Sequence, residues 1–320
     1  MARAGRRRDG SPWKEKMMTL EKTHLESRIS SGKSVLIAEI APPAASDAQA
    51  VRSCARQYAG KVHAVGISDN RGDVRMAALA AASLVAAEGV EPILHVVTRD
   101  RNRIALASEC LGAAALGVRN FLCTTGTHQT LGGCRSARNV FDIDSVQLLQ
   151  MYAGRNGATA GSTYLSGAGP FCLGAAASPY ADPLEMQVMR LAKKIEAGAA
   201  FLVTQPVFDF DRFNTWWKEV TRRGLHEQAA ILAGVQPLTS VEAARACANA
   251  RPQTTIPDSV LQRLASAGDA RLQRATGVEI AVETIRQLSK LDGLRGFEIR
   301  ADADDELPLQ VIEKAGLRVD

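Results

Sequence analysis

The sequence predicts an α/β protein, a single-domain (β/α)8 TIM barrel, from three observations. Eight short apolar runs of strand length alternate with longer helical patterns or long loops from about residue 30 onward. The runs are continuously apolar, as strands of a parallel sheet buried on both faces must be. Several units repeat the order helix, glycine, apolar strand and polar loop, and eight such units close naturally into a barrel.

The expected strands follow one another at intervals that leave room for a helix or a long loop. They are Val35–Ile40, Val62–Ile67, Pro92–Thr98, Asn120–Thr124, Phe171–Ala175, Ala200–Thr204, Ala229–Val235 and Gly296–Ile299. Gly89, Gly117 and Gly198 stand just before three of these strands. Glycine accepts the left-handed conformation that ends a helix, so these positions predict where three helices stop.

The best-defined helix follows the fifth strand, in "DPLEMQVMRLAKKIEAGA". Asp182 is the expected N-cap, Pro183 the first helical residue and Glu185 the capping-box residue. Its apolar residues form one stripe, with Arg190 and Lys194 beside it. The stripe consists of Leu184, Val188, Leu191 and Ile195.

One long connection runs from Gly126 to Gly169 and contains a helical piece, "DIDSVQLLQMYA", and a Gly/Ser-rich tail. Loops of this length within a barrel usually carry function. The domain prediction is a disordered basic arm over residues 1–20 and one barrel domain over residues 21–320.

Composition narrows the class of protein. The chain is 46% hydrophobic and 23% charged, which excludes disorder of the whole chain. No apolar run is long enough for a membrane span, and no apolar segment that could serve as a secretory signal follows the first arginines. We therefore expect a cytoplasmic protein that does not bind a membrane. The net charge of +5 arises largely from "MARAGRRRDG", and only 5% of residues are aromatic, which argues against nucleic acid as a partner.

Several common sites are missing from the sequence. The six cysteines form no C-x-x-C pair and H-E-x-x-H is absent, so we expect neither a disulfide framework nor a metal. G-x-G-x-x-G is also absent, so a Rossmann unit would not hold a cofactor.

Polar residues lie within the expected strands toward their carboxyl ends, or directly follow them, where barrel enzymes place their chemistry. They are Glu39, Ser68, Asp69, Asn70, His95, the loop "TTGTH" and Gln205. Burial of Glu39 would raise its pKa toward that of a general acid, although a carboxylate satisfied by hydrogen bonds inside the barrel fits the same position. His95 fits a ligand contact and a hydrogen-bonded core histidine equally.

Other polar positions carry more specific expectations. Gln205 before a proline is typical of a ligand contact, because a buried amide needs several partners. Around Gly126, Thr124, Thr125 and Thr127 form a loop that offers hydroxyl groups and backbone donors to a phosphate or a polar ring. At least two of the arginines in "TRDRNR" are expected on a solvated face, and Trp216 and Trp217 in the core.

Three motifs occur in a specific order along the chain: "AEIAPP" in the first strand, "ASPYADP" leading into "KKIEAGAAFLVTQPVFD", and "AGVQPLTS" after the seventh strand. Over about residues 20–318 the chain resembles the methylenetetrahydrofolate reductase family, flavin-dependent barrel enzymes of one-carbon metabolism. The resemblance is closest to the branch linked to corrinoid-dependent and methylotrophic one-carbon metabolism, which suggests the oxidative direction, in methyl-group catabolism.

The resemblance implies a role for each candidate residue. Glu39 would be the general acid that opens the five-membered ring of methylenetetrahydrofolate, and Gln205 would bind the pterin, with Thr127 and Phe208 also at the substrate. A flavin, FAD favoured over FMN, would pass hydride, with NADH or NADPH as co-substrate. The flavin-contacting positions would be His95, Thr125, Gly126, Ala175, Arg190 and Lys194.

The chain also departs from the family's pattern. Thr127 stands where an aspartate is usual and Thr125 where an arginine is common, while Gly66 replaces a hydroxyl residue. Pro206 and Val207 replace aromatic residues, which leaves Phe208 as the stacking candidate. Two alternatives remain: a flavin-independent reductase, and a non-redox folate-binding or methyl-transfer subunit. We expect folate as substrate, an electron-transfer or methyltransferase partner protein, and a homo-oligomer.

Overall fold

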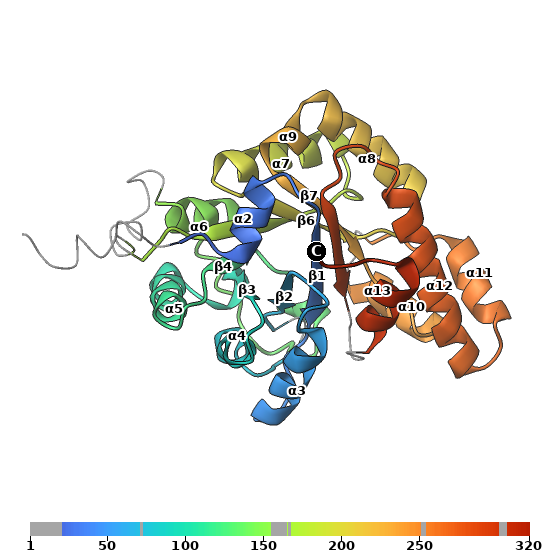
Figure 1. Cartoon of the computed structure of the whole chain (residues 1–320), viewed down its shortest axis with the longest axis horizontal. Coiled ribbons are helices and arrows are strands. Elements are labelled where there is room, and N and C mark those ends of the chain that lie inside the picture. Colours follow the sequence, from blue (N-terminus) through green and yellow to red (C-terminus); the bar gives the residue numbers. More distant parts are fainter. Residues whose placement is uncertain (1–20, 71–72, 155–164, 166–167, 251–253, 301–305) are drawn as a thin grey trace, which may run out of the picture.

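The computed structural model is a closed barrel of eight parallel strands surrounded by helices, which confirms the predicted (β/α)8 fold (Figure 1). The structure describes residues 21–70, 73–154, 165, 168–250, 254–300 and 306–320. The predicted basic arm over residues 1–20 therefore lies outside the described residues.

The strands occur in sequence order around the barrel, and β1 pairs with both β2 and β8, which closes it. The strands are β1 (Val35–Ile40), β2 (Ala64–Ile67), β3 (Pro92–Val97), β4 (Asn120–Thr124), β5 (Cys172–Ala177), β6 (Phe201–Pro206), β7 (Ala230–Val235) and β8 (Gly296–Arg300). All eight predicted strands are present, and the bounds of β1 and β4 agree with the prediction. The others differ by one or two residues at one end or, for β5 and β6, at both ends, where strand pairing rather than composition sets the limit.

Helices cover the outside of the barrel, and in the described part of the chain three of them follow one another between β7 and β8. The helices are α2 (His24–Ser30), α3 (Ala48–Tyr58), α4 (Ala78–Ala87), α5 (Arg103–Ala115), α6 (Ser145–Tyr152), α7 (Leu184–Glu196), α8 (Phe210–Arg222), α9 (Leu225–Gln228), α10 (Val241–Ala250), α11 (Asp258–Ser266), α12 (Ala270–Leu288) and α13 (Leu307–Ala315). Within the described ranges, none of these helices has the length and apolar character needed to cross a membrane.

The start of α7 differs from the prediction. Pro183 is the N-cap, with an extended ψ of 145°, and the helix begins at Leu184. The Asp182 side chain does not cap the helix, because its carboxylate accepts a hydrogen bond of 2.9 Å from Arg212 on α8. The predicted apolar stripe does face inward, as the buried Val188 shows.

The core has two main layers, one between strands and helices and one inside the barrel. The inner layer consists of Leu25, Val35, Ile37, Ala64, Ile93, Leu122, Cys172, Phe201, Val203, Ala230 and Leu232. Helix α2 closes the amino end of the barrel, with Leu25 fully buried. The Thr23 hydroxyl donates a 2.8 Å hydrogen bond to Asn120 Oδ1, and Glu91 accepts hydrogen bonds from Leu25 N and Asn120 Nδ2. The amino end of the barrel is thus closed, and the polar side chains at the carboxyl end lie next to the inner apolar layer.

Candidate active site

Glu39 lies inside the barrel because side chains alternate along β1. Val35 and Ile37 belong to the inner layer, so Glu39 points to the same side. Its side chain is 1% exposed. On the neighbouring strands, Gly66 and Arg300 stand in register with Glu39.

Glu39 belongs to a buried group of charged and titratable side chains that we call the carboxylate cluster: Glu39, His95, Glu298 and Arg300. One oxygen of each carboxylate and a ring nitrogen of His95 lie within 4.8 Å of one another. Arg300 Nε donates a 2.5 Å hydrogen bond to Glu298 Oε2 and lies 3.3 Å from Glu39 Oε2. Both glutamates are 1% exposed and Arg300 is 7% exposed.

The two β8 members of the cluster are absent from the sequence prediction. In "GFEIR" the charged residues Glu298 and Arg300 alternate with apolar ones, and this is the signal that could have pointed to them. By spacing, the two carboxylates and His95 would also suit a divalent cation. Arg300 already supplies the positive charge beside both carboxylates, so we interpret the group as an acid–base cluster.

Gly66 makes room for His95. A Cβ atom at residue 66 would lie 2.9 Å from His95 Nε2 and 3.7 Å from Glu39 Cγ. The first distance is shorter than real Cβ contacts allow, so a hydroxyl residue at this position would push the imidazole away. Glycine at residue 66, where the family usually has a hydroxyl residue, therefore allows His95 to occupy its position.

We expect Gly66→Ala to lower the free energy of unfolding by about 1–3 kcal/mol, because the added methyl overpacks the space held by His95. Gly112→Ala is the matched control. Its Cβ, in the middle of α5, would meet only Leu79 at 3.5 Å, so this change should stabilise by about 0.5–1 kcal/mol. Urea unfolding of both variants measures the difference, and equal effects would contradict the proposed crowding.

Strand β6 carries Gln205 at an irregularity in its pairing with β7. The register shifts between Val203 and Pro206. The Thr204 hydroxyl donates to the Gln205 carbonyl at 2.8 Å and accepts from Gly234 N at 3.0 Å, which fixes this segment. Gln205 Oε1 is buried and has no hydrogen-bond partner among the described residues. A buried amide oxygen without a donor is costly, so this atom marks a position where a ligand N–H would bind.

Arg99 connects the loops that follow β2, β3 and β4. Its guanidinium donates to the carbonyls of Asn70 (2.9 Å) and Thr127 (3.2 Å) and pairs with Asp100. It is only 6% exposed, and Arg101 pairs with the buried Asp69, so the expected solvated face is wrong for these two arginines. Their charges are used to hold the loops together.

The "TTGTH" loop begins with a close approach of β4 to β3. Gly126 has φ +85°, and a Cβ there would lie 2.6 Å from Val97 Cγ1. The Thr125 hydroxyl accepts a 3.1 Å hydrogen bond from Ser145 N at the start of α6, and the Thr127 side chain is exposed. The structure thus gives Thr125 a role in capping a helix.

Three other predicted site residues are not members of the carboxylate cluster. Ala175 belongs to the core layer between strands and helices, so alternation directs Ala176 toward the barrel interior instead. Phe208 packs on a small apolar cluster with Leu238 and Ala244. Arg190 lies on the exposed side of α7.

Lys194 connects α7 to β5. Its Nζ donates a 2.6 Å hydrogen bond to the Ala176 carbonyl. Burial, and then the positive charge of Arg190, lower the pKa of Lys194 from its ordinary 10.5 to about 8, against an opposing effect of Asp144. The ammonium group is therefore held at some cost to stability wherever it is charged in the folded protein.

The pH dependence of stability tests this arrangement. Between the two pKa values the unfolded chain binds more protons at Lys194 than the folded one. The free energy of unfolding therefore increases as pH rises from about 8 toward 10.5, and decreases as pH falls back toward 8. Relative to Lys194→Met, the wild-type free energy of unfolding should rise by about 2 kcal/mol between about pH 7 and about pH 10. Lys193→Met, at the exposed neighbouring position, is the control. Parallel profiles of wild type and Lys194→Met would contradict the lowered pKa.

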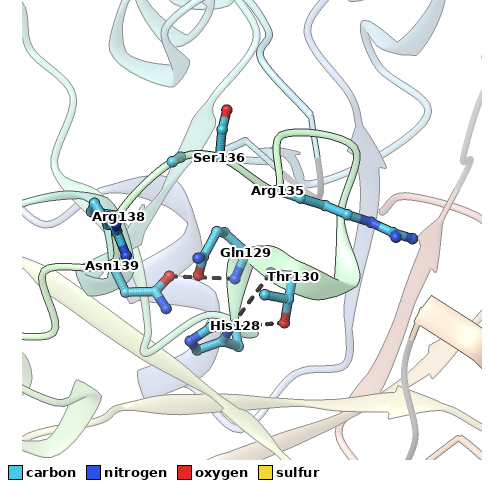
Figure 2. A pocket seen from close by; sticks show the side chains of 8 residues that line it. His128, Gln129, Thr130, Arg135, Ser136, Arg138 and Asn139 are labelled. Atoms are coloured by element: carbon cyan, nitrogen blue, oxygen red, sulfur yellow. Dashed lines mark hydrogen bonds between the residues drawn. The ribbon is translucent and has the colours of Figure 1, made fainter.

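A cavity of about 650 Å³ lies in the loop after β4. Its lining consists of His128, Gln129, Thr130, Arg135, Ser136, Ala137, Arg138 and Asn139. Figure 2 shows Asn139 directed at Gln129, and Arg135 extending away from this contact. None of the lining residues comes from a barrel strand, so the cavity does not include Glu39, but its two arginines suit an anionic ligand group.

Comparisons with known proteins agree with these observations. The profile of the methylenetetrahydrofolate reductase family matches residues 24–316. Methylenetetrahydrofolate reductase 2 of Saccharomyces cerevisiae is 27% identical over 154 residues, which cover 46% of this chain and 25% of the yeast protein. Methylenetetrahydrofolate reductase 1 of Schizosaccharomyces pombe is 29% identical over 152 residues, 46% of this chain and 24% of that protein. The matched region thus spans about a quarter of each yeast protein.

A solved structure from Clostridium thermocellum has the same fold. It has a TM-score of 0.63 and 13% sequence identity, and the match covers 91% of this chain and 97% of that one. That protein is described as binding two copies of 5-methyl-5,6,7,8-tetrahydrofolic acid. At this identity the likeness concerns the fold alone.

Proposed function

Because the chain belongs to the methylenetetrahydrofolate reductase family, we propose that it interconverts 5,10-methylenetetrahydrofolate and 5-methyltetrahydrofolate. Hydride would pass through a bound flavin, with NADH, NADPH or a partner protein as electron donor or acceptor. The observation that carries the proposal is the buried carboxyl group of Glu39 inside the barrel, where it can hold and deliver a proton.

Glu39 would act on the folate ring. In the reductive direction its O–H bond breaks and an N–H bond forms on a folate nitrogen, while the bond from that nitrogen to the methylene carbon breaks. The methylene carbon is left as an iminium ion on the other nitrogen and can accept hydride. Gln205 Oε1, buried and without a partner among the described residues, would accept an N–H of the pterin and orient this ring.

The inward positions beside Glu39 fit a flat ring system. Alternation directs Gly66, Thr124, Ala176 and Gly234 toward the upper barrel interior, and all four are small. A bound flavin would accept and donate hydride there. His95 would contact it from β3, and Arg135 and Arg138 would supply positive charge for a diphosphate, which favours FAD over FMN.

The resemblance to the corrinoid-linked branch supports the oxidative direction, from methyl- to methylenetetrahydrofolate, in methyl-group catabolism. We place this activity in the cytoplasm, in a homo-oligomer that works with an electron-transfer or methyltransferase protein. These features rest on the sequence patterns given above.

A second candidate, a flavin-independent reductase, is favoured by one observation. Thr125 stands where the family commonly has an arginine, so it supplies no positive charge to a cofactor phosphate, and its hydroxyl accepts a hydrogen bond from Ser145 N. In this case hydride would pass directly between nicotinamide and the folate carbon, with Glu39 in the same role.

The visible absorption spectrum of the purified protein separates these candidates. We expect flavin bands that bleach on anaerobic addition of methyltetrahydrofolate, because the oxidative reaction delivers hydride to the flavin. A colourless protein that takes up no added flavin but reduces methylenetetrahydrofolate with a nicotinamide would support direct hydride transfer. Folate binding without any turnover would instead support a non-redox subunit and overturn the proposed reductase.

A further inference from the structure

We propose that Glu298 and Arg300 are positioning residues that keep Glu39 protonated at neutral pH. The inference rests on the proposed role of Glu39 as general acid. A general acid must still carry its proton when substrate arrives, and a lone carboxylate close to an arginine would ordinarily lose it.

The distances show which carboxylate forms the stronger hydrogen bond with Arg300. Arg300 Nε lies 2.5 Å from Glu298 Oε2 and 3.3 Å from Glu39 Oε2, so the strong charge-assisted hydrogen bond goes to Glu298. Arg300 Nη2 also donates to the Thr204 carbonyl at 3.2 Å, which holds the guanidinium in place. Glu298 is therefore the member of the pair that ionises.

The same geometry disfavours a second negative charge. Oxygens of Glu39 and Glu298 lie within 4.8 Å of each other, and both side chains are removed from water. With Glu298 ionised, one guanidinium balances one carboxylate, and ionisation of Glu39 would leave a net negative charge in the barrel. Glu39 thus retains its proton as the neutral member of two coupled carboxyl groups.

Each neighbouring element contributes to this balance. β2 brings only Gly66 to the level of Glu39, and β3 brings His95. Asp69, beyond the end of β2, is engaged with Arg101 and with Val97 N. His95 lies in the cluster, and a histidine side chain can carry a positive charge, so the test includes a background without it.

The test compares Glu298→Gln with Glu283→Gln. Both changes remove a carboxylate that lies 2.5 Å from an arginine nitrogen, but the Glu283–Arg263 pair is at the surface, between α11 and α12. The rate at which methylenetetrahydrofolate oxidises the reduced holoenzyme is measured against pH, in the wild-type and His95→Asn backgrounds. Nicotinamide-driven reduction of the enzyme is measured in parallel.

In Glu298→Gln, Arg300 turns to Glu39 and stabilises its ionised form. We expect the folate step to lose activity at a pH lower by about one unit or more, and its rate at neutral pH to fall about tenfold. Nicotinamide-driven reduction and the Glu283→Gln profile should stay unchanged, and Glu298→Asp should restore the wild-type midpoint. A Glu298→Gln profile with the wild-type midpoint, or a pH-independent loss, would overturn the inference.

A second measurement is independent of turnover. The infrared band of a protonated carboxyl group, assigned by its loss in Glu39→Gln, should be present in the wild-type protein at neutral pH and absent in Glu298→Gln. If folate is not reduced at all but the band behaves in this way, the proposed function fails and the inference stands. If Glu298→Gln does not fold, Arg300→Gln serves instead. In Arg300→Gln the infrared band of protonated Glu39 should persist to a higher pH than in the wild type. Loss of the band at the same pH as in the wild type would contradict the inference.

Discussion

Glu39→Gln is expected to lower the rate of folate reduction by about 10²- to 10⁴-fold, the usual contribution of a general acid. The amide has nearly the same shape as the carboxyl group but cannot give up a proton to a folate nitrogen. Nicotinamide-driven flavin reduction, which needs no such proton, should remain largely intact. Single-turnover measurements of the two half-reactions give the two rates separately.

The control is Glu185→Gln, the same change on the exposed face of α7. It should leave both rates unchanged. Circular dichroism of Glu39→Gln excludes loss of the fold as the cause of a lowered rate. An equal loss in both half-reactions, with the fold retained, would show that Glu39 acts on something other than the folate ring.

Arg300→Met is expected to lower the free energy of unfolding by about 3–5 kcal/mol at neutral pH, because removing the cation leaves Glu298 and Glu39 buried without it. Methionine preserves much of the side-chain volume, so the loss should arise mainly from charge. Chemical unfolding across a pH series measures it. The deficit should shrink as pH falls, because protonation of Glu298 removes the buried negative charge that the missing cation leaves uncompensated.

Arg263→Met provides the comparison at the surface, where the partner Glu283 remains in contact with water. Its effect should lie below about 1 kcal/mol. If the Arg300→Met deficit were as large at acid pH as at neutral pH, lost packing rather than unbalanced charge would explain it.

The sequence predicted the barrel well because each strand is a continuous apolar run, and this signal depends on burial on both faces rather than on any particular contact. Glu39 could be found because a single carboxylate interrupts such a run. Gln205 was predicted for a similar reason, at the end of another strand. Each of the two predictions depends only on the sequence of the strand in which the residue lies.

The rest depends on register and on contacts between distant segments. Ala175 and Ala176 are equivalent by composition, and only the pairing of β5 with its neighbours directs one outward and the other inward. Arg300 lies one residue beyond the predicted end of its strand, and besides Glu298 on the same strand its partners come from β1 and β6. No local pattern records the pairings with β1 and β6.

The carboxylate cluster also has a consequence for how the protein matures. Glu39 lies on the first strand of the barrel, and Glu298 and Arg300 on the eighth, so the cluster forms only when β1 pairs with β8. Contacts this far apart in sequence are slow to form, and β8 is synthesised after the other seven strands. A nascent chain can thus build helices and most strands while the buried environment of Glu39 is still missing, and the environment on which the proposed acid role depends arrives together with the completed fold.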